Sequence, residues 1–265
     1  LMILVTFIAF FLGGLILGLF IFDVSFSEIQ NISNDTSNIG LLKYLQVLQS
    51  FSLFIIPSVI LSFLFKRNGL KYLYLDNKPR IVSSLIVISL IILSIPFINY
   101  LAELNSKLNL PDSMSKIENW MKTSEQQAME LTEKFLKVDT VKGLLFNIFM
   151  IALLPAIGEE FFFRGIFQRL FCEWTKSAHA GIFISAFLFS SFHLQFYGFL
   201  PRLILGIMLG YFLVWSKSLW LPILAHFINN LLAVLTYYFI TIGAINPEIE
   251  KIGSKNGRRF RKDGI

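Results

Sequence analysis

Six polar side chains lie inside long apolar runs, where a polar group is costly and is expected to serve a function. All six aspartates lie in connections between apolar runs, and only two of the eleven glutamates lie within one. These two glutamates are neighbours, and an arginine follows four residues after the second. Two histidines and one asparagine complete the set, which is Glu159, Glu160, Arg164, His193, His226 and Asn230.

The spacing of these residues places them on three helical segments. Arg164 lies four residues after Glu160, so the two side chains share a helix face and can form an ion pair. Asn230 lies four residues after His226, so one turn of helix points both side chains the same way. His193 ends a third apolar run, AFLFSSFH.

A glutamate and a histidine in an apolar setting can hydrolyse an amide bond. The carboxylate acts as a general base for water, and a histidine beside it shares the proton. A second histidine and an amide can donate hydrogen bonds to the oxyanion of a tetrahedral intermediate, a contribution of roughly 3–4 kcal/mol in other hydrolases.

Other hydrolytic sites fit the sequence less well. The zinc-binding string H-E-x-x-H is absent, and no aspartate pair lies in an apolar run, as an aspartyl protease would need. Ser190 and Ser191 precede His193 without the glycine-flanked turn of a serine nucleophile. A glutamate–histidine site remains.

Each of these residues also has a purely structural interpretation. Glu160 and Arg164 could form an ion pair that ties helices together, a buried histidine is often a packing residue, and Asn230 could join two helices. One shared site on three segments explains the whole set more economically.

The composition indicates a membrane protein as the setting of this site. The 265 residues are 55% hydrophobic and only 15% charged, with 29 phenylalanines and a mean hydropathy of +0.68. Soluble domains carry about 25% charge. A single cysteine excludes a disulfide scaffold, and the net charge of +6 is spread over short connections and a basic C-terminal cluster, which argues against nucleic-acid binding.

Seven segments are apolar and long enough to be candidate membrane spans, and we expect an all-α bundle of about seven to eight spans enclosing a polar cavity. The first segment is expected to be a span, because it lacks the basic start and cleavage pattern of a signal peptide. The segments are 1–22, 44–65, 81–101, 143–171, 179–195, 201–216 and 219–241.

The connections predict an orientation in the membrane. Residues 66–80 carry five cations and one acid, which is typical of a cytoplasmic loop, whereas 23–40 contain no Lys or Arg. If the seven spans are counted from these two loops, the basic C-terminal tail lies on the outer side of the membrane. The alternatives are an eighth crossing or one short segment that does not cross. In the stretch 102–141, the spacing of Met114, Ile117, Trp120 and Met121 predicts an amphipathic helix at the membrane surface.

Three motifs resemble those of the CAAX protease and bacteriocin-processing family of intramembrane proteases. Residues 159–164 (EEFFFR) resemble its E-E-x-x-x-R motif, 189–193 (FSSFH) its F-x-x-x-H motif, and 226–230 (HFINN) its H-x-x-x-N motif. The motifs follow in order, about 33 residues apart. The resemblance covers roughly residues 140–242, including G-x-x-x-G at Gly206 and Gly210, and predicts three parts: N-terminal helices (1–141), a catalytic core (142–242) and a basic tail (243–265).

The resemblance also implies a role for each residue. Glu159 and His193 would activate water, His226 and Asn230 would stabilise the oxyanion, and Glu160 with Arg164 would support the site. No cofactor is favoured, although two histidines and a glutamate could hold zinc. The expected partners are a membrane-associated peptide or protein substrate, of CaaX or bacteriocin-leader type, and the bilayer, in the plasma or cytoplasmic membrane. The alternatives are a non-catalytic membrane scaffold or immunity protein and, less favoured, a proton-relaying transporter.

Overall fold

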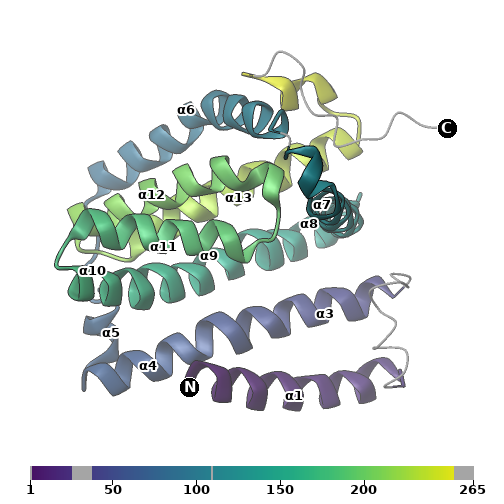
Figure 1. The fold of residues 1–265 in the computed structure, drawn as a ribbon. Coiled ribbons are helices and arrows are strands. Elements are labelled where there is room, and N and C mark those ends of the chain that lie inside the picture. The colour runs from purple at the N-terminus through teal and green to yellow at the C-terminus, as the bar shows by residue number, and fades with distance from the viewer. Residues whose placement is uncertain (1, 26–37, 109, 254–265) are drawn as a thin grey trace.

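The computed structural model describes residues 2–25, 38–108 and 110–253, and within these ranges all regular secondary structure is helical. The helices pack roughly side by side into a bundle (Figure 1). The predicted all-α multi-pass bundle is confirmed.

Six helical stretches are long and apolar enough to cross a membrane. The first is α1 (Met2–Phe22), and the second runs through α3 (Ile39–Gln49) and α4 (Ile56–Phe65). The third is α6 (Ile81–Ser106), and the fourth runs from α8 (Val141–Asn147) through α9 (Leu154–Glu159) to α10 (Arg169–Thr175). The last two are α12 (Phe199–Ser216) and α13 (Trp220–Thr241).

The predicted span 179–195 is shorter in the structure than the sequence suggests. It forms α11 (Ala178–Phe192), whose 15 residues extend about 22 Å, less than the roughly 30 Å of hydrocarbon. The described structure thus offers six candidate spans where the sequence predicts seven, and α11 ends next to His193.

Two of the spans contain wide π-helical turns that precede a proline. The segment Ser50–Ile55 is followed by Pro57, and the segment Ile148–Leu153 is followed by Pro155. Proline has no N–H to donate to the carbonyl four residues earlier, so one hydrogen bond of the regular α-helix is missing there. The helix continues through each proline by changing its hydrogen-bond pattern.

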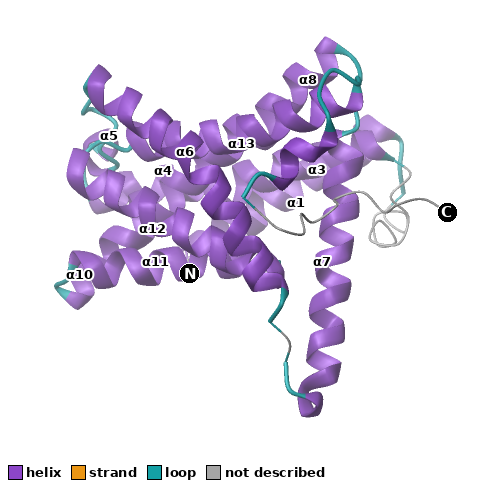
Figure 2. Ribbon diagram, turned by 90° about the horizontal axis from the view of Figure 1, so that it is seen from above, coloured by secondary structure: helices purple, strands orange, loops and turns teal. Residues whose placement is uncertain are grey.

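A surface helix lies across one end of the bundle. It is α7 (Ser115–Leu136), which Figure 2 shows at a steep angle to the spans. Ile117 and Trp120 on α7 are exposed, as is Met114 in the turn before it, and Phe135 is buried against Leu42 and Met150. The predicted helix is confirmed, and its place at the membrane surface stays a prediction.

The two ends of the bundle carry different connections. One end, which we call the basic end, holds α5 (Gly69–Tyr72) within the loop 66–80 and the turns that follow α10 and α12 (Figure 1). The other end holds α7, the loop 193–198 and the end of α13. The structure therefore places the start of the C-terminal tail away from the basic loop, and the side of the membrane on which the tail lies stays a prediction.

Candidate active site

The glutamates lie midway along the stretch Val141–Thr175, where α9 gives way to a second π-helical segment, Glu160–Gln168. Segments of this kind are frequent at functional sites. The aromatic rings of Phe162, Phe163 and Phe189 pack into a buried cluster beside them. The carboxylates therefore lie in an apolar interior formed by this stretch and α11.

Glu160 and Arg164 form the predicted ion pair. Their Oε1 and Nη1 atoms lie 2.8 Å apart, and the two side chains are 0% and 1% exposed. The Arg164 guanidinium also donates to the Gly206 carbonyl (3.1 Å) on α12 and stacks on the ring of Phe189, 4.5 Å from its centre. The pair thus joins the stretch Val141–Thr175 to α11 and α12.

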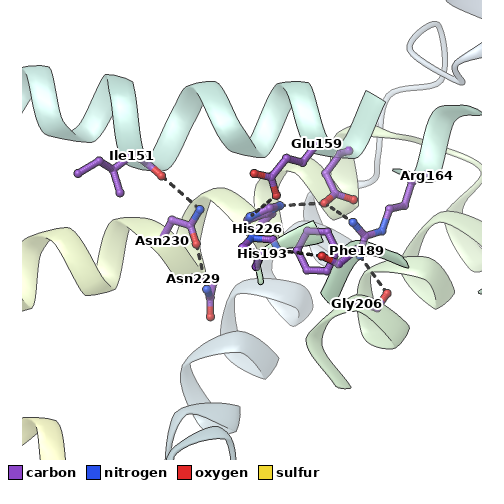
Figure 3. A network of polar contacts seen from close by, with 10 residues as sticks. Ile151, Glu159, Arg164, Phe189, His193, Gly206, His226, Asn229 and Asn230 are labelled. Atoms are coloured by element: carbon purple, nitrogen blue, oxygen red, sulfur yellow. Dashed lines mark hydrogen bonds and ion pairs between the residues drawn. The ribbon is translucent and has the colours of Figure 1, made fainter. Parts of the chain in front are cut away.

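His226 lies between the two glutamates (Figure 3). Its Nδ1 donates a hydrogen bond of 2.8 Å to Glu160 Oε1, and its Nε2 lies 3.9 Å from Glu159 Oε2. A continuous polar chain thus runs from Arg164 through Glu160 and His226 to Glu159. The hydrogen bond from Nδ1 to Glu160 sets the orientation of the imidazole ring. As a result, Nε2 is the ring nitrogen that faces Glu159.

His193 reaches the same place from the end of α11. Its Nδ1 donates to the Phe189 carbonyl (2.8 Å), and its ring packs against the Phe189 ring at 5.0 Å between centres. The ring of His226 contacts the same Phe189 ring at 5.8 Å. A carbonyl only accepts hydrogen bonds, so the neutral His193 ring carries its proton on Nδ1 and has a free lone pair on Nε2.

The two glutamates differ in exposure. Glu159 is 14% exposed and Glu160 is 0% exposed. The Oε2 atoms of both glutamates are buried and have no hydrogen-bond partner in the described protein. His193 is also only half-buried.

Asn230 makes contacts of its own. Its Nδ2 donates to the Ile151 carbonyl (3.3 Å), and its Oδ1 accepts from Asn229 (3.1 Å). Ile151 lies four residues before Pro155, which cannot donate to that carbonyl, so the Asn230 amide supplies a hydrogen bond there. No hydrogen bond joins Asn230 to the site's carboxylates in the described structure. Polar contacts thus link Glu159, Glu160, Arg164 and His226, while His193 is connected to them through the Phe189 ring and Asn230 lies one helical turn from His226.

Comparison with known proteins bears on this region. Residues 141–232 match the family model of the type II CAAX prenyl endopeptidase Rce1-like proteins. These residues are therefore similar to Rce1-like proteins. The match covers about a third of the chain, includes all six candidate residues, and confirms the resemblance to the CAAX protease family. Comparisons with curated proteins and with solved structures found no match.

The match has two consequences for the chain as a whole. Rce1-like proteins are a protease family, which supports a peptidase. Together with the six candidate spans, the match identifies an integral membrane protein that crosses the bilayer several times.

Three further residues of the Rce1-like region support the site and were not singled out as site residues from the sequence. Phe189 contacts both histidines and Arg164, and Gly206 accepts a hydrogen bond from Arg164. Gln168 is buried and donates to the Gly210 carbonyl (3.1 Å). The available signal was spacing, because Gln168 follows Arg164 by four residues just as Gly210 follows Gly206.

The donor groups do not form a metal site. Across the described ranges, no group of three or more His, Cys, Asp or Glu side chains could hold a metal ion. Glu160 accepts hydrogen bonds from Arg164 and His226, so its Oε1 is already engaged. As arranged in the structure, these residues do not fit a zinc ion.

Proposed function

We propose that the chain is a glutamate-dependent intramembrane endopeptidase. Glu159 and His193 would activate water, His226 and Asn230 would stabilise the oxyanion, and Glu160 with Arg164 would hold His226 in place. The observation that carries this proposal is the difference in exposure along one polar chain. Glu159, which is 14% exposed, lies at one end, and the fully buried Glu160–Arg164 pair lies at the other.

The first step would be attack by water on the peptide carbonyl. Glu159 Oε2 takes one proton from the water as its oxygen bonds to the carbonyl carbon. The free Nε2 lone pair of His193 accepts the second hydrogen of the water and orients it. When the intermediate collapses, the carbon–nitrogen bond breaks and the proton held by Glu159 passes to the leaving amine.

The oxyanion would need hydrogen-bond donors while it exists. His226 donates its Nδ1 proton to Glu160, so it can donate from Nε2 only as the doubly protonated ring. The Asn230 amide has two N–H groups and gives one to Ile151, which leaves the second for the oxyanion. Donors held in place before the reaction lower its barrier.

The substrate would be a membrane-associated peptide or protein. Five of the six residues lie on helices long and apolar enough to cross the bilayer, and the description of the matched family names prenyl endopeptidases. We therefore propose a peptide bond near a membrane anchor, of CaaX or bacteriocin-leader type.

Replacement of Glu159 tests the proposal. Glu159→Gln keeps the shape of the side chain but removes the base, so cleavage of a prenylated CaaX peptide by the chain in proteoliposomes should fall about 10²-fold or more. Peptides from membranes of cells with and without the change are compared by mass spectrometry to find the natural substrate. Glu173→Gln is the matched control, because Glu173 lies on the same helical stretch and is exposed.

Two outcomes would contradict a glutamate-dependent enzyme. The first is full cleavage by the Glu159→Gln protein. The second is a cellular effect that survives this change, which would favour a scaffold or immunity protein. A strong chelator separates the metal-dependent version, since the proposed mechanism expects turnover to persist after chelation.

A further inference from the structure

A second site lies at the basic end of the bundle, on the loop 66–80 and the ends of α10 and α12. It is a pocket of about 290 Å³, at the lower limit of common ligand pockets, which suits a small headgroup. Four cations line it against one acid, Asp76. The four cations are Lys66, Lys71, Arg169 and Lys217.

The floor of this pocket, which we call the phosphate pocket, is fixed by hydrogen bonds between distant parts of the chain. Asn77 Nδ2 donates to the Lys217 carbonyl (3.0 Å), and the backbone N–H of Leu219 donates to the Tyr74 carbonyl (3.1 Å). The Ser218 hydroxyl donates to the Asn77 carbonyl. The pocket is therefore formed before any ligand arrives, which lowers the entropy cost of binding.

Arg169 forms one wall of the phosphate pocket. Its guanidinium carbon lies 4.0 Å from the centre of the Tyr72 ring and 4.7 Å from that of Tyr74, and it donates to the Tyr72 carbonyl. Stacking on two rings holds its flat face in place.

The charge of the phosphate pocket is not neutralised within the protein. In the described structure, Lys66, Lys71 and Lys217 form no ion pair with an acidic side chain. Three like charges held near one another attract an anion.

The phosphate pocket lies at the ends of the candidate spans, at the level expected for lipid headgroups. It lies where several spans end, and two exposed tryptophans close to these ends, Trp174 (78%) and Trp215 (73%), mark a membrane–water interface. Basic pockets between spans at such a level bind anionic headgroups.

We propose that this pocket binds a phosphate group, either that of an anionic lipid headgroup or that of a soluble phosphate ester. The proposal is independent of peptidase activity, since it concerns binding at a separate end of the molecule.

The test compares lipid binding by two double variants of the full chain. Native mass spectrometry of the purified protein measures binding of phosphatidylglycerol, with phosphatidylcholine as the neutral lipid. Lys71→Gln with Lys217→Gln removes two pocket charges. Lys78→Gln with Lys176→Gln removes the same charge from the same end but from residues that do not line the pocket. The pairs match closely, because Lys176 and Lys217 both end a helix with positive φ.

Each lysine near an anionic surface contributes about fivefold to binding, so the pocket variant should bind phosphatidylglycerol about 30-fold more weakly while the control binds nearly as wild type. Equal loss in both variants would overturn the proposal in favour of diffuse attraction, as would equal binding of the two lipids by the wild type. Thermal unfolding without lipid checks that the variants are folded. Excess glycerol 3-phosphate identifies the source: displacement of the lipid supports a soluble ester, and no displacement supports a lipid headgroup.

Discussion

The helix α1 and the stretch Val141–Thr175 are both long enough to cross a bilayer, but they use their apolar residues differently. Within the most apolar window, α1 is 6% buried inside the protein, whereas Val141–Thr175 is 33% buried. The first packs along one side against α3 and α4 and has few buried residues, whereas the second is surrounded by other helices. Buried charges occur on the second, because only a helix surrounded by protein can provide partners for them.

This contrast predicts that peptide cleavage depends on residues that face the interior of the bundle. His193→Ala should lower turnover about 10²–10⁴-fold, since it removes the free ring nitrogen at the site. His179→Ala is the control, because His179 lies at the other end of α11, is exposed and contacts Tyr211. Cleavage assays on membranes with equal protein levels measure both. Equal activity of the His193→Ala and His179→Ala proteins would contradict the proposed role.

Substitutions in the two regions should differ in their effect on the free energy of unfolding, because the stretch Val141–Thr175 carries a buried ion pair. Arg164→Ala leaves Glu160 charged and buried without its partner, which should cost about 3–5 kcal/mol. Phe20→Ala on α1 removes a ring that is 80% exposed and should change stability by less than about 0.5 kcal/mol. Unfolding of the purified protein in detergent measures both changes. Similar losses would mean that α1 is packed as tightly as the site.

Glycines in the two regions should respond in opposite directions. A Cβ at Gly206 would lie 3.0 Å from Ala186 Cβ, so Gly206→Ala should destabilise by about 1–3 kcal/mol and loosen the Arg164 hydrogen bond. A Cβ at Gly13 would meet nothing within 4 Å, so Gly13→Ala should stabilise α1 by about 0.5–1 kcal/mol. The same unfolding experiment measures both, and stabilisation by Gly206→Ala would show that α11 and α12 can separate.

The sequence predicted the spans and the polar residues because both follow from the cost of polarity in lipid. Long apolar runs must be helices there, and a glutamate within such a run must have partners. The Glu160–Arg164 pair was predictable for the same reason, as its members lie one helical turn apart.

Other features depend on contacts between segments far apart in the chain. The hydrogen bond from Asn230 to Ile151 spans 79 positions, and only the packing of α13 against the central stretch brings the two together. Composition also did not predict that α11 ends at Phe192, because residues 193–195 directly follow an apolar run. The loop 193–198 is held by a contact from far away in the chain, a hydrogen bond to the carboxylate of Glu125 on α7. The division at residues 141–142 stays a prediction.

The π-helical segment Glu160–Gln168 also sets the angle between two functional surfaces. Arg164 faces the site, whereas Gln168 and Arg169 at its far end face Gly210 and the phosphate pocket. Each residue of an α-helix turns the chain by about 100°, and each residue of a wider π-helical turn by somewhat less. Deleting Phe167 would therefore leave Glu160 and Arg164 in place and rotate everything beyond them by about that angle. The number of residues in this segment thus fixes the rotation between the proposed active site and the phosphate pocket.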